Sequence, residues 1–104
     1  MTGMAAALFA AVIVVAAEAY AAEVSDAEVM AIMQRHCVTC HAKRPTHASF
    51  DVPPKNVSLE TIDEVKAWAV KIVEQVVLDR NMPVGIDSGM TEVERAALAQ
   101  WAAR

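Results

Sequence analysis

The sequence predicts an all-α fold built on three main helices. Three segments have the form of a capping box, in which a hydroxyl residue is followed three positions later by Glu: Ser25–Glu28, Thr61–Glu64 and Thr91–Glu94. Apolar residues recur at helical spacing after each segment, and prolines separate the helical stretches. We therefore expect helices that begin just after Ser25, Thr61 and Thr91.

The chain has 104 residues and a net charge of -4. This length allows one domain, which we expect at residues 24–104, after an N-terminal segment of a different kind. A core of about 80 residues is usually marginal without a covalent link, a metal or a cofactor. The nine Lys and Arg residues are scattered from Arg35 to Arg104, so the sequence predicts no nucleic-acid partner.

The segment from Met4 to Ala17 is uncharged and apolar, and it predicts an N-terminal apolar helix. Residues 1–22 have the length of a signal peptide, and Ala19-Tyr20-Ala21 matches an A-x-A cleavage site, although no Lys or Arg precedes the run. The alternative is a membrane anchor with Glu18 at the interface, and a buried core helix is the weaker third interpretation. A signal peptide or an anchor would place the domain in the periplasm, free or held at the inner membrane.

The first helix is expected to bury Val29, Ile32 and Met33, and its apolar face leads into Cys37-Val38-Thr39-Cys40-His41. This Cys-x-x-Cys-His run is the attachment sequence of a c-type haem. Two thiols three positions apart on a helical turn can each add to one vinyl group of the same porphyrin, and His41 is then placed to coordinate the iron. The motif predicts one covalent haem c per chain.

Other interpretations of the two cysteines are a disulfide, a redox-active dithiol or half of a zinc site. Zinc usually needs a second Cys/His pair, and only His36 and His47 remain for it. A thioredoxin-like dithiol follows a strand, whereas the residues before Cys37 predict helix. We expect His36 to be a solvated or packing residue rather than a ligand.

Residues 42–58 predict a loop, because three prolines and an asparagine interrupt the helical periodicity. Such a loop would wrap the porphyrin edge, where Lys43, Arg44 or Lys55 could neutralise a propionate or face solvent. His47 is a weak candidate for the second axial ligand, since it lies six residues after the proximal histidine.

The second helix is expected to be the longest, and to run from its Thr61 cap to near Arg80-Asn81. Its apolar face consists of Ile62, Val65, Ala69, Ile72, Val73 and Val76. Trp68 is expected to belong to the core, with contact to the haem edge as the minority interpretation.

Met82 is the second residue with ligand chemistry, because Pro83 and Gly85 place it in a turn that cannot be helical. Thioether sulfur is a soft ligand that suits low-spin haem iron, and a rigid loop could bring it to the opposite ring face. Met90 is the weaker competitor. The final helix is expected to turn Val93, Ala97, Leu98 and Trp101 inward and to pack near the first helix.

The order of these parts resembles the class I cytochrome c fold, a small fold of three main helices around a covalently attached haem. Over residues 24–104 the chain also looks like the C-terminal cytochrome domain of the membrane-bound bacterial urate hydroxylase (urate oxidase) family. The segments that carry this second resemblance are His36-Cys37-Val38-Thr39-Cys40-His41, Arg44-Pro45-Thr46 with Phe50, Pro54-Lys55-Asn56-Val57, Asn81-Met82-Pro83, Gly89-Met90-Thr91 and Glu94-Arg95.

The resemblance implies that Cys37 and Cys40 are thioether sites, that His41 is the proximal ligand and that Met82 is the distal ligand. It implies that the domain is an electron-transfer module rather than an enzyme. This module would pass electrons from a urate-oxidising membrane domain to a respiratory cytochrome or oxidase. In that family a multi-helix membrane domain precedes the haem domain, so residues 1–22 could also be the remnant of a last transmembrane helix.

Three function classes remain open at this point. The first is an electron carrier with both axial positions closed, linked to urate or free-standing in the periplasm. The second is a haem protein with a labile distal site that binds or converts a ligand, and the third is a zinc-binding interaction module.

Overall fold

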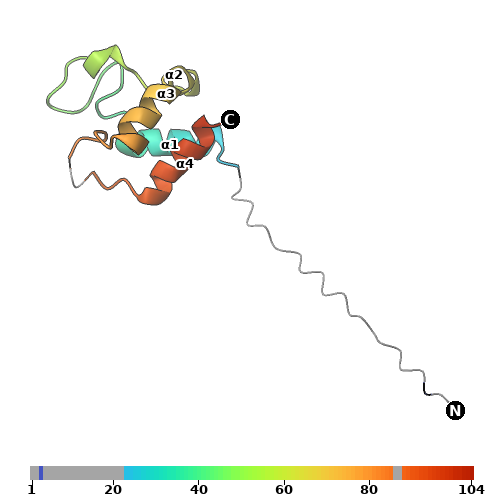
Figure 1. Ribbon diagram of the computed structural model, residues 1–104. Helices are drawn as coiled ribbons and strands as arrows, with labels where there is room; N and C mark the ends of the chain where they lie inside the picture. Colours follow the sequence, from blue (N-terminus) through green and yellow to red (C-terminus); the bar gives the residue numbers. More distant parts are fainter. Residues whose placement is uncertain (1–2, 4–22, 86–87) are drawn as a thin grey trace.

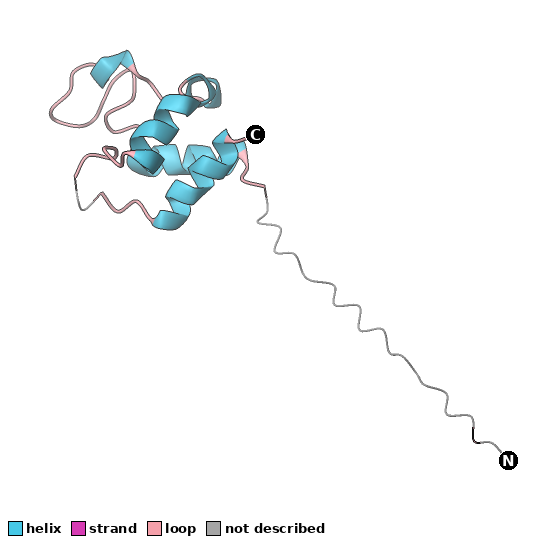
Figure 2. Cartoon of the chain, in the orientation of Figure 1, coloured by secondary structure: helices cyan, strands magenta, loops and turns pink. Residues whose placement is uncertain are grey.

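The computed structural model describes residue 3, residues 23–85 and residues 88–104 (Figure 1). The predicted N-terminal apolar helix, with its signal-peptide or anchor interpretations, lies outside these residues. The described part contains helices and loops but no strand, which confirms the all-α class for it (Figure 2). None of its helices combines the length and the apolar character needed to span a bilayer.

In the part of the chain that the structure describes, six helical elements follow one another. They are α1 (Asp26–His36), the 3-10 turn η1 (Pro54–Asn56), α2 (Ile62–Ala67), α3 (Ala69–Ile72), the π-helix η2 (Val73–Leu78) and α4 (Glu92–Ala102). Helices α1 and α4 pack against each other, as the sequence predicts, and α4 also packs against η2 (Figure 1).

The three predicted caps start helices, although they are not equally complete. Thr61 and Thr91 each accept a hydrogen bond from the backbone N–H of the Glu three positions later, and that Glu side chain accepts one from the backbone N–H of the Thr. The Ser25 hydroxyl oxygen accepts from the Glu28 N–H at 3.1 Å, but the Glu28 side chain does not accept a hydrogen bond from the Ser25 N–H. The first cap is therefore half of the box that the sequence predicts.

The prediction of one long second helix is wrong. The chain leaves helical geometry at Trp68, with φ -98° and ψ 7°, where the Trp68 N–H donates to the carbonyls of both Glu64 and Lys66 and ends α2. A new helix starts at Ala69 and widens into η2 after Ile72, so α2 points away from the line of α3 (Figure 1). The helical run ends at Leu78, and Arg80 follows in the left-handed region with φ 57°.

The core contains most of the predicted apolar positions. Its buried members are Val24, Val29, Ile32, Met33, Cys37, Leu59, Val65, Ile72, Val76, Leu98 and Trp101. Two predicted positions are exceptions: Val73 is only partly buried and is not among the residues packed against this core, and Val93 is 79% exposed. Glu94 lies four residues before Leu98 and so occupies the inward-facing position that we expected Val93 to take. The inward face of α4 thus begins with a carboxylate rather than an apolar side chain.

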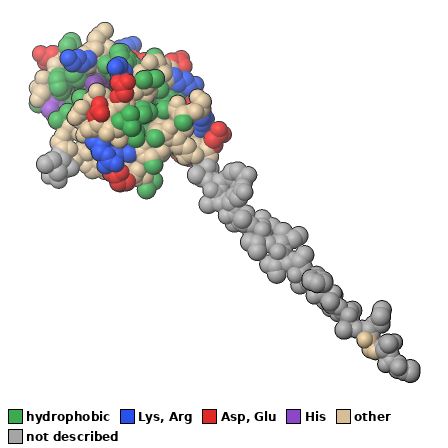
Figure 3. All heavy atoms as spheres, viewed as in Figure 1, with side chains coloured by type: hydrophobic (Ala, Val, Ile, Leu, Met, Phe, Trp, Pro, Cys, Tyr) green, Lys and Arg blue, Asp and Glu red, His purple; other side chains and the backbone are tan. Residues whose placement is uncertain are grey.

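The surface of the domain is mixed in charge. On the face drawn in Figure 3, acidic and basic side chains alternate among apolar ones and do not gather into one patch of either sign. Ion pairs join several of them, including Lys66 with Asp26 at 3.5 Å and Lys71 with Glu74 at 3.0 Å. Exposed pairs of this kind contribute little to stability, so the core and the caps hold the fold.

Candidate functional site

An apolar cavity of about 310 Å³ lies beside the cysteine motif (residues 37–41) and the methionine loop, the irregular chain at residues 79–85 that contains Met82. Three of its lining residues carry ligand or thiol chemistry: Cys37, His41 and Met82. The remaining lining residues are Lys55, Val57, Leu59, Trp68, Lys71, Ile72, Gln75 and Val76. Apolar walls with a few convergent polar groups are typical of a cofactor pocket, and this volume lies in the range of about 300–1,000 Å³ usual for such sites.

The cysteine motif is positioned by the end of α1. The Cys37 N–H donates to the Met33 carbonyl at 2.9 Å, which continues the helical pattern one residue beyond His36. The chain then makes one more turn, since the His41 N–H donates to the Cys37 carbonyl at 2.8 Å. Residues four apart on such a turn lie on the same side. Cys37 and His41 therefore reach the same cavity, whereas Cys40 is half-buried and is not among the described lining residues.

His41 is held by two contacts with residues of the loop that follows. Its ring Nδ1 lies 3.0 Å from the Val57 carbonyl oxygen, and its own carbonyl accepts from the Leu59 N–H at 2.9 Å. In a neutral imidazole, an Nδ1–H that donates to a carbonyl leaves the Nε2 lone pair free for a metal. The sequence did not predict Val57 and Leu59 as partners, because main-chain groups leave no signal in a side-chain pattern.

Met82 lies in the loop after η2, as predicted, and is partly buried against the core. Its N–H donates to the Gln75 carbonyl at 3.1 Å, and its carbonyl accepts from Nη1 of Arg95 at 3.2 Å. The preceding Asn81 donates from Nδ2 to Oε1 of Gln75 at 3.3 Å. The loop has no helical hydrogen bonds of its own around Met82. Gln75 of η2 and the Arg95 side chain of α4 fix it instead.

The competing ligand candidates are not among the described residues that line the cavity. His47 is exposed, and its Nδ1 accepts from the Ser49 N–H at 3.1 Å, with its ring centroid 5.6 Å from that of Phe50. Met90 packs against the core but is not among the described residues that line the cavity. His36 is a packing residue, as one of the two predicted alternatives has it, because its side chain is 9% exposed and bonds to Glu94.

Two lysines line the cavity. Lys55 is one of the predicted propionate partners, and it sits in the left-handed region with φ 57° in η1. Lys71 was not predicted, and its ammonium also pairs with Glu74. Lys43 and Arg44 are absent from the described lining residues. Lys71 lies four residues before Gln75, which also lines the cavity, so the two share one face of this helical run.

The two cysteines are free thiols, and their surroundings differ. Burial raises the pKa of the Cys37 thiol to about 12, with smaller contributions from Cys40 and Glu94. A redox-active dithiol needs a cysteine whose pKa is lowered, so the environment of Cys37 disfavours that interpretation. Structural zinc sites use four Cys or His ligands, and the described residues bring no three His, Cys, Asp or Glu side chains together.

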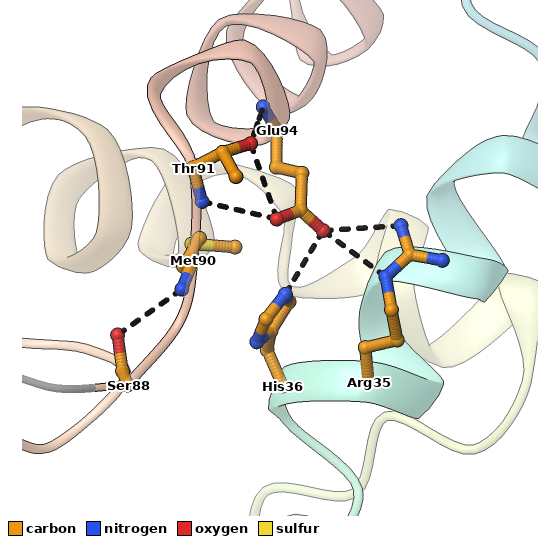
Figure 4. A network of polar contacts seen from close by, with 6 residues as sticks. All are labelled: Arg35, His36, Ser88, Met90, Thr91 and Glu94. Atoms are coloured by element: carbon orange, nitrogen blue, oxygen red, sulfur yellow. Dashed lines mark hydrogen bonds and ion pairs between the residues drawn. The ribbon is translucent and has the colours of Figure 1, made fainter.

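Glu94 joins the start of α4 to the end of α1 (Figure 4). Its Oε2 accepts from Arg35 at 3.0 Å and lies 2.9 Å from Nε2 of His36, while its Oε1 accepts from the Thr91 N–H. Burial alone would raise the pKa of Glu94, but hydrogen bonds from Thr91, Arg35 and His36 outweigh it and lower the pKa to about 2. The carboxylate thus fixes the residue next to Cys37 to the final helix.

Comparisons of the chain with protein-family models, with curated proteins and with solved structures found no match.

Proposed function

We propose that this chain is a c-type cytochrome domain that carries single electrons. In this proposal one haem is joined covalently to Cys37 and Cys40, and its iron is held by His41 and Met82. The observation that supports it best is the shared cavity, because Cys37, His41 and Met82 come from two distant segments and line one apolar space. A cysteine motif alone would not require a methionine at the same cavity.

The residues at the cavity fit the chemistry of this cofactor. Hydrogen bonding of Nδ1 to Val57 orients the His41 ring and makes Nε2 a better donor to iron. The thioether of Met82 is the soft ligand that favours ferrous haem. Lys55 and Lys71 supply positive charge for the two propionate groups of a haem. Trp68 adds an aromatic wall that helps to exclude water.

Attachment to the chain needs no outside oxidant or reductant. Cys37 and Cys40 would hold the haem through thioether bonds, since an S–H added across a vinyl C=C bond gives one C–S and one C–H bond with no change in electron count. When bound, the haem supplies a one-electron couple at its iron. His41 and Met82 would hold the iron, and with two protein ligands in place the group would supply electron transfer rather than substrate binding.

We further propose that the electrons come from urate oxidation or from another periplasmic dehydrogenation. They would pass to a respiratory cytochrome or oxidase, and the domain would lie in the periplasm, free or anchored at the inner membrane. The sequence resemblance is what supports this part of the proposal.

The test is an absorption spectrum of protein produced in a host that matures c-type cytochromes. We expect haem that resists extraction by acidified organic solvent, sharp bands in the reduced state and a weak sulfur-to-iron band in the oxidised state. The matched control is the double variant Cys37→Ala, Cys40→Ala, which should lose the covalent haem. High-spin bands that shift with carbon monoxide would contradict the proposal and would indicate a haem protein with a labile distal site. The absence of a Soret band, together with bound zinc, would replace it by a zinc module.

A further inference from the structure

Arg95 of α4 contacts the backbone of the methionine loop. Its Nη1 donates to the Met82 carbonyl at 3.2 Å and also to the carbonyl of Val76 in η2. Val76 belongs to the last turn of its helix, where carbonyl groups lack helical partners and need donors from elsewhere. One guanidinium nitrogen therefore ties the end of η2 and the Met82 peptide to the same point on α4.

The contact from Arg95 completes the fixation of Met82. The N–H of Met82 already donates to the Gln75 carbonyl, so both main-chain polar groups of this residue are bonded to other elements. At the base of the loop, Arg80 makes two bonds to the Glu92 carboxylate, at 2.6 and 2.7 Å. The direction in which the Met82 side chain leaves the backbone is thus set mainly by contacts with η2 and α4.

Adjacent residues of α4 serve the two segments that line the cavity. Glu94 bonds to His36, which precedes Cys37, and Arg95 bonds to Met82. Neighbours on a helix point in directions about 100° apart, so one turn of α4 can contact both the chain just before Cys37 and the loop that carries Met82.

We propose that Arg95 is a positioning residue that keeps the Met82 sulfur on the iron and so keeps the site closed to other ligands. This inference rests on the proposed function, because it concerns a ligand of the proposed haem. Hydrogen bonds from a charged donor are the stronger ones, and a carbonyl left without this donor would let the peptide of Met82 turn away. Arg95 then determines whether the domain carries electrons or binds small ligands.

The experiment uses the holoprotein with Arg95→Met and Arg95→Lys, and Arg35→Met as the matched control. Arg35 is a suitable control because it is also an arginine that bonds to another element. Its partner is Glu94 of α4, and it makes no bond to the methionine loop. The measurements are covalent haem per chain, the sulfur-to-iron band across a pH series, carbon monoxide binding to the reduced protein and the thermal midpoint. The sulfur-to-iron band and carbon monoxide binding both report whether Met82 is bound to the iron. A general loss of stability would lower the thermal midpoint but would leave these two readouts unchanged in the folded protein.

We expect Arg95→Met to keep covalent haem and to lose the sulfur-to-iron band at a lower pH than the native protein. The fraction of open iron, and with it the apparent affinity for carbon monoxide, should rise roughly tenfold. Arg95→Lys should lie between the two, because the shorter ammonium cannot reach both carbonyls as the guanidinium does. Arg35→Met should keep the native band and carbon monoxide response.

A lower thermal midpoint with an unchanged band and unchanged carbon monoxide binding in Arg95→Met would overturn the inference. If that variant does not accumulate, Arg95→Lys decides, and a native pH profile in it overturns the inference as well. The native protein separates the two proposals. If it lacks covalent haem or the sulfur-to-iron band, the proposed function fails, whereas a native band that both Arg95 variants keep rejects only the role of Arg95.

Discussion

The two segments that meet at the cavity are held in different ways. Residues 37–41 continue α1, and backbone bonds from Cys37 to Met33 and from His41 to Cys37 fix them locally. Met82 lies in irregular chain and is fixed by contacts with Gln75 and Arg95, which belong to η2 and α4. The backbone of the first segment is thus fixed mainly by its own helical bonds, with the His41 ring held by Val57 of the next loop, whereas the second segment has no helical bonds of its own and depends on η2 and α4. Substitutions should therefore act locally at His41 and more widely around Met82.

The largest effect should come from His41→Ala, which removes the proposed proximal ligand from the locally fixed segment. We expect covalent haem but no ordered ligation, because no other histidine of the described residues lines the cavity. Absorption spectra of the oxidised and reduced protein measure this. His47→Ala is the control, since that side chain is exposed and bonds to Ser49, and it should leave the spectrum unchanged. A native-like spectrum in His41→Ala would refute the assignment.

Met82→Ala should have the next largest effect and should change the site without destroying it. The variant should keep covalent haem, bind exogenous ligands and show a lower reduction potential, because the soft thioether stabilises the ferrous state. Potentiometric titration and carbon monoxide binding provide the measurements, with Met90→Ala as the control. An unchanged spectrum in Met82→Ala would move the ligand to Met90 or His47.

Glu94→Gln should have a smaller effect, on stability rather than on ligation. The variant weakens bonds to Arg35 and His36, and it should lower the free energy of unfolding by about 1–3 kcal/mol at neutral pH. Urea unfolding of native protein and variant across a pH series measures this difference.

The pH dependence of that difference follows from the lowered pKa of Glu94. The folded-state pKa is about 2 and the ordinary value is 4.5, so between these values the unfolded chain binds more protons than the folded protein. The stabilisation is complete above pH 4.5 and is lost as the pH falls towards 2. The gap between native protein and variant should shrink across that window. A gap that stayed constant there would show that the charge of Glu94 is not its source.

The sequence predicted the parts of the site that depend on local chemistry. The caps at Thr61 and Thr91, the helix that leads into Cys37 and the non-helical position of Met82 follow from neighbouring residues, and all four are observed. Short-range hydrogen bonds and the geometry of proline and glycine determine such features, so a pattern of a few residues carries them.

Features that depend on tertiary contacts were not predicted. The break at Trp68 has no Gly or Pro to mark it, and the apolar spacing continues through it into η2. The role of Glu94 in the cap was predicted but its inward position was not, because the bonds to Arg35 and His36 that help to offset its burial are tertiary contacts with α1. The same holds for Arg95, whose acceptors are backbone carbonyls that no side-chain pattern can show.

The central claim is that the two differently held segments meet at one haem, and proton NMR of the reduced holoprotein with isotope-labelled methionine methyl groups tests it most directly. The ring current of a porphyrin shifts the methyl signal of an axial methionine far upfield. The account predicts one such signal among the six methionines, and its disappearance in Met82→Leu but not in a Met90→Leu control. An upfield signal that persists in Met82→Leu, or the absence of any such signal in the native protein, would contradict the account.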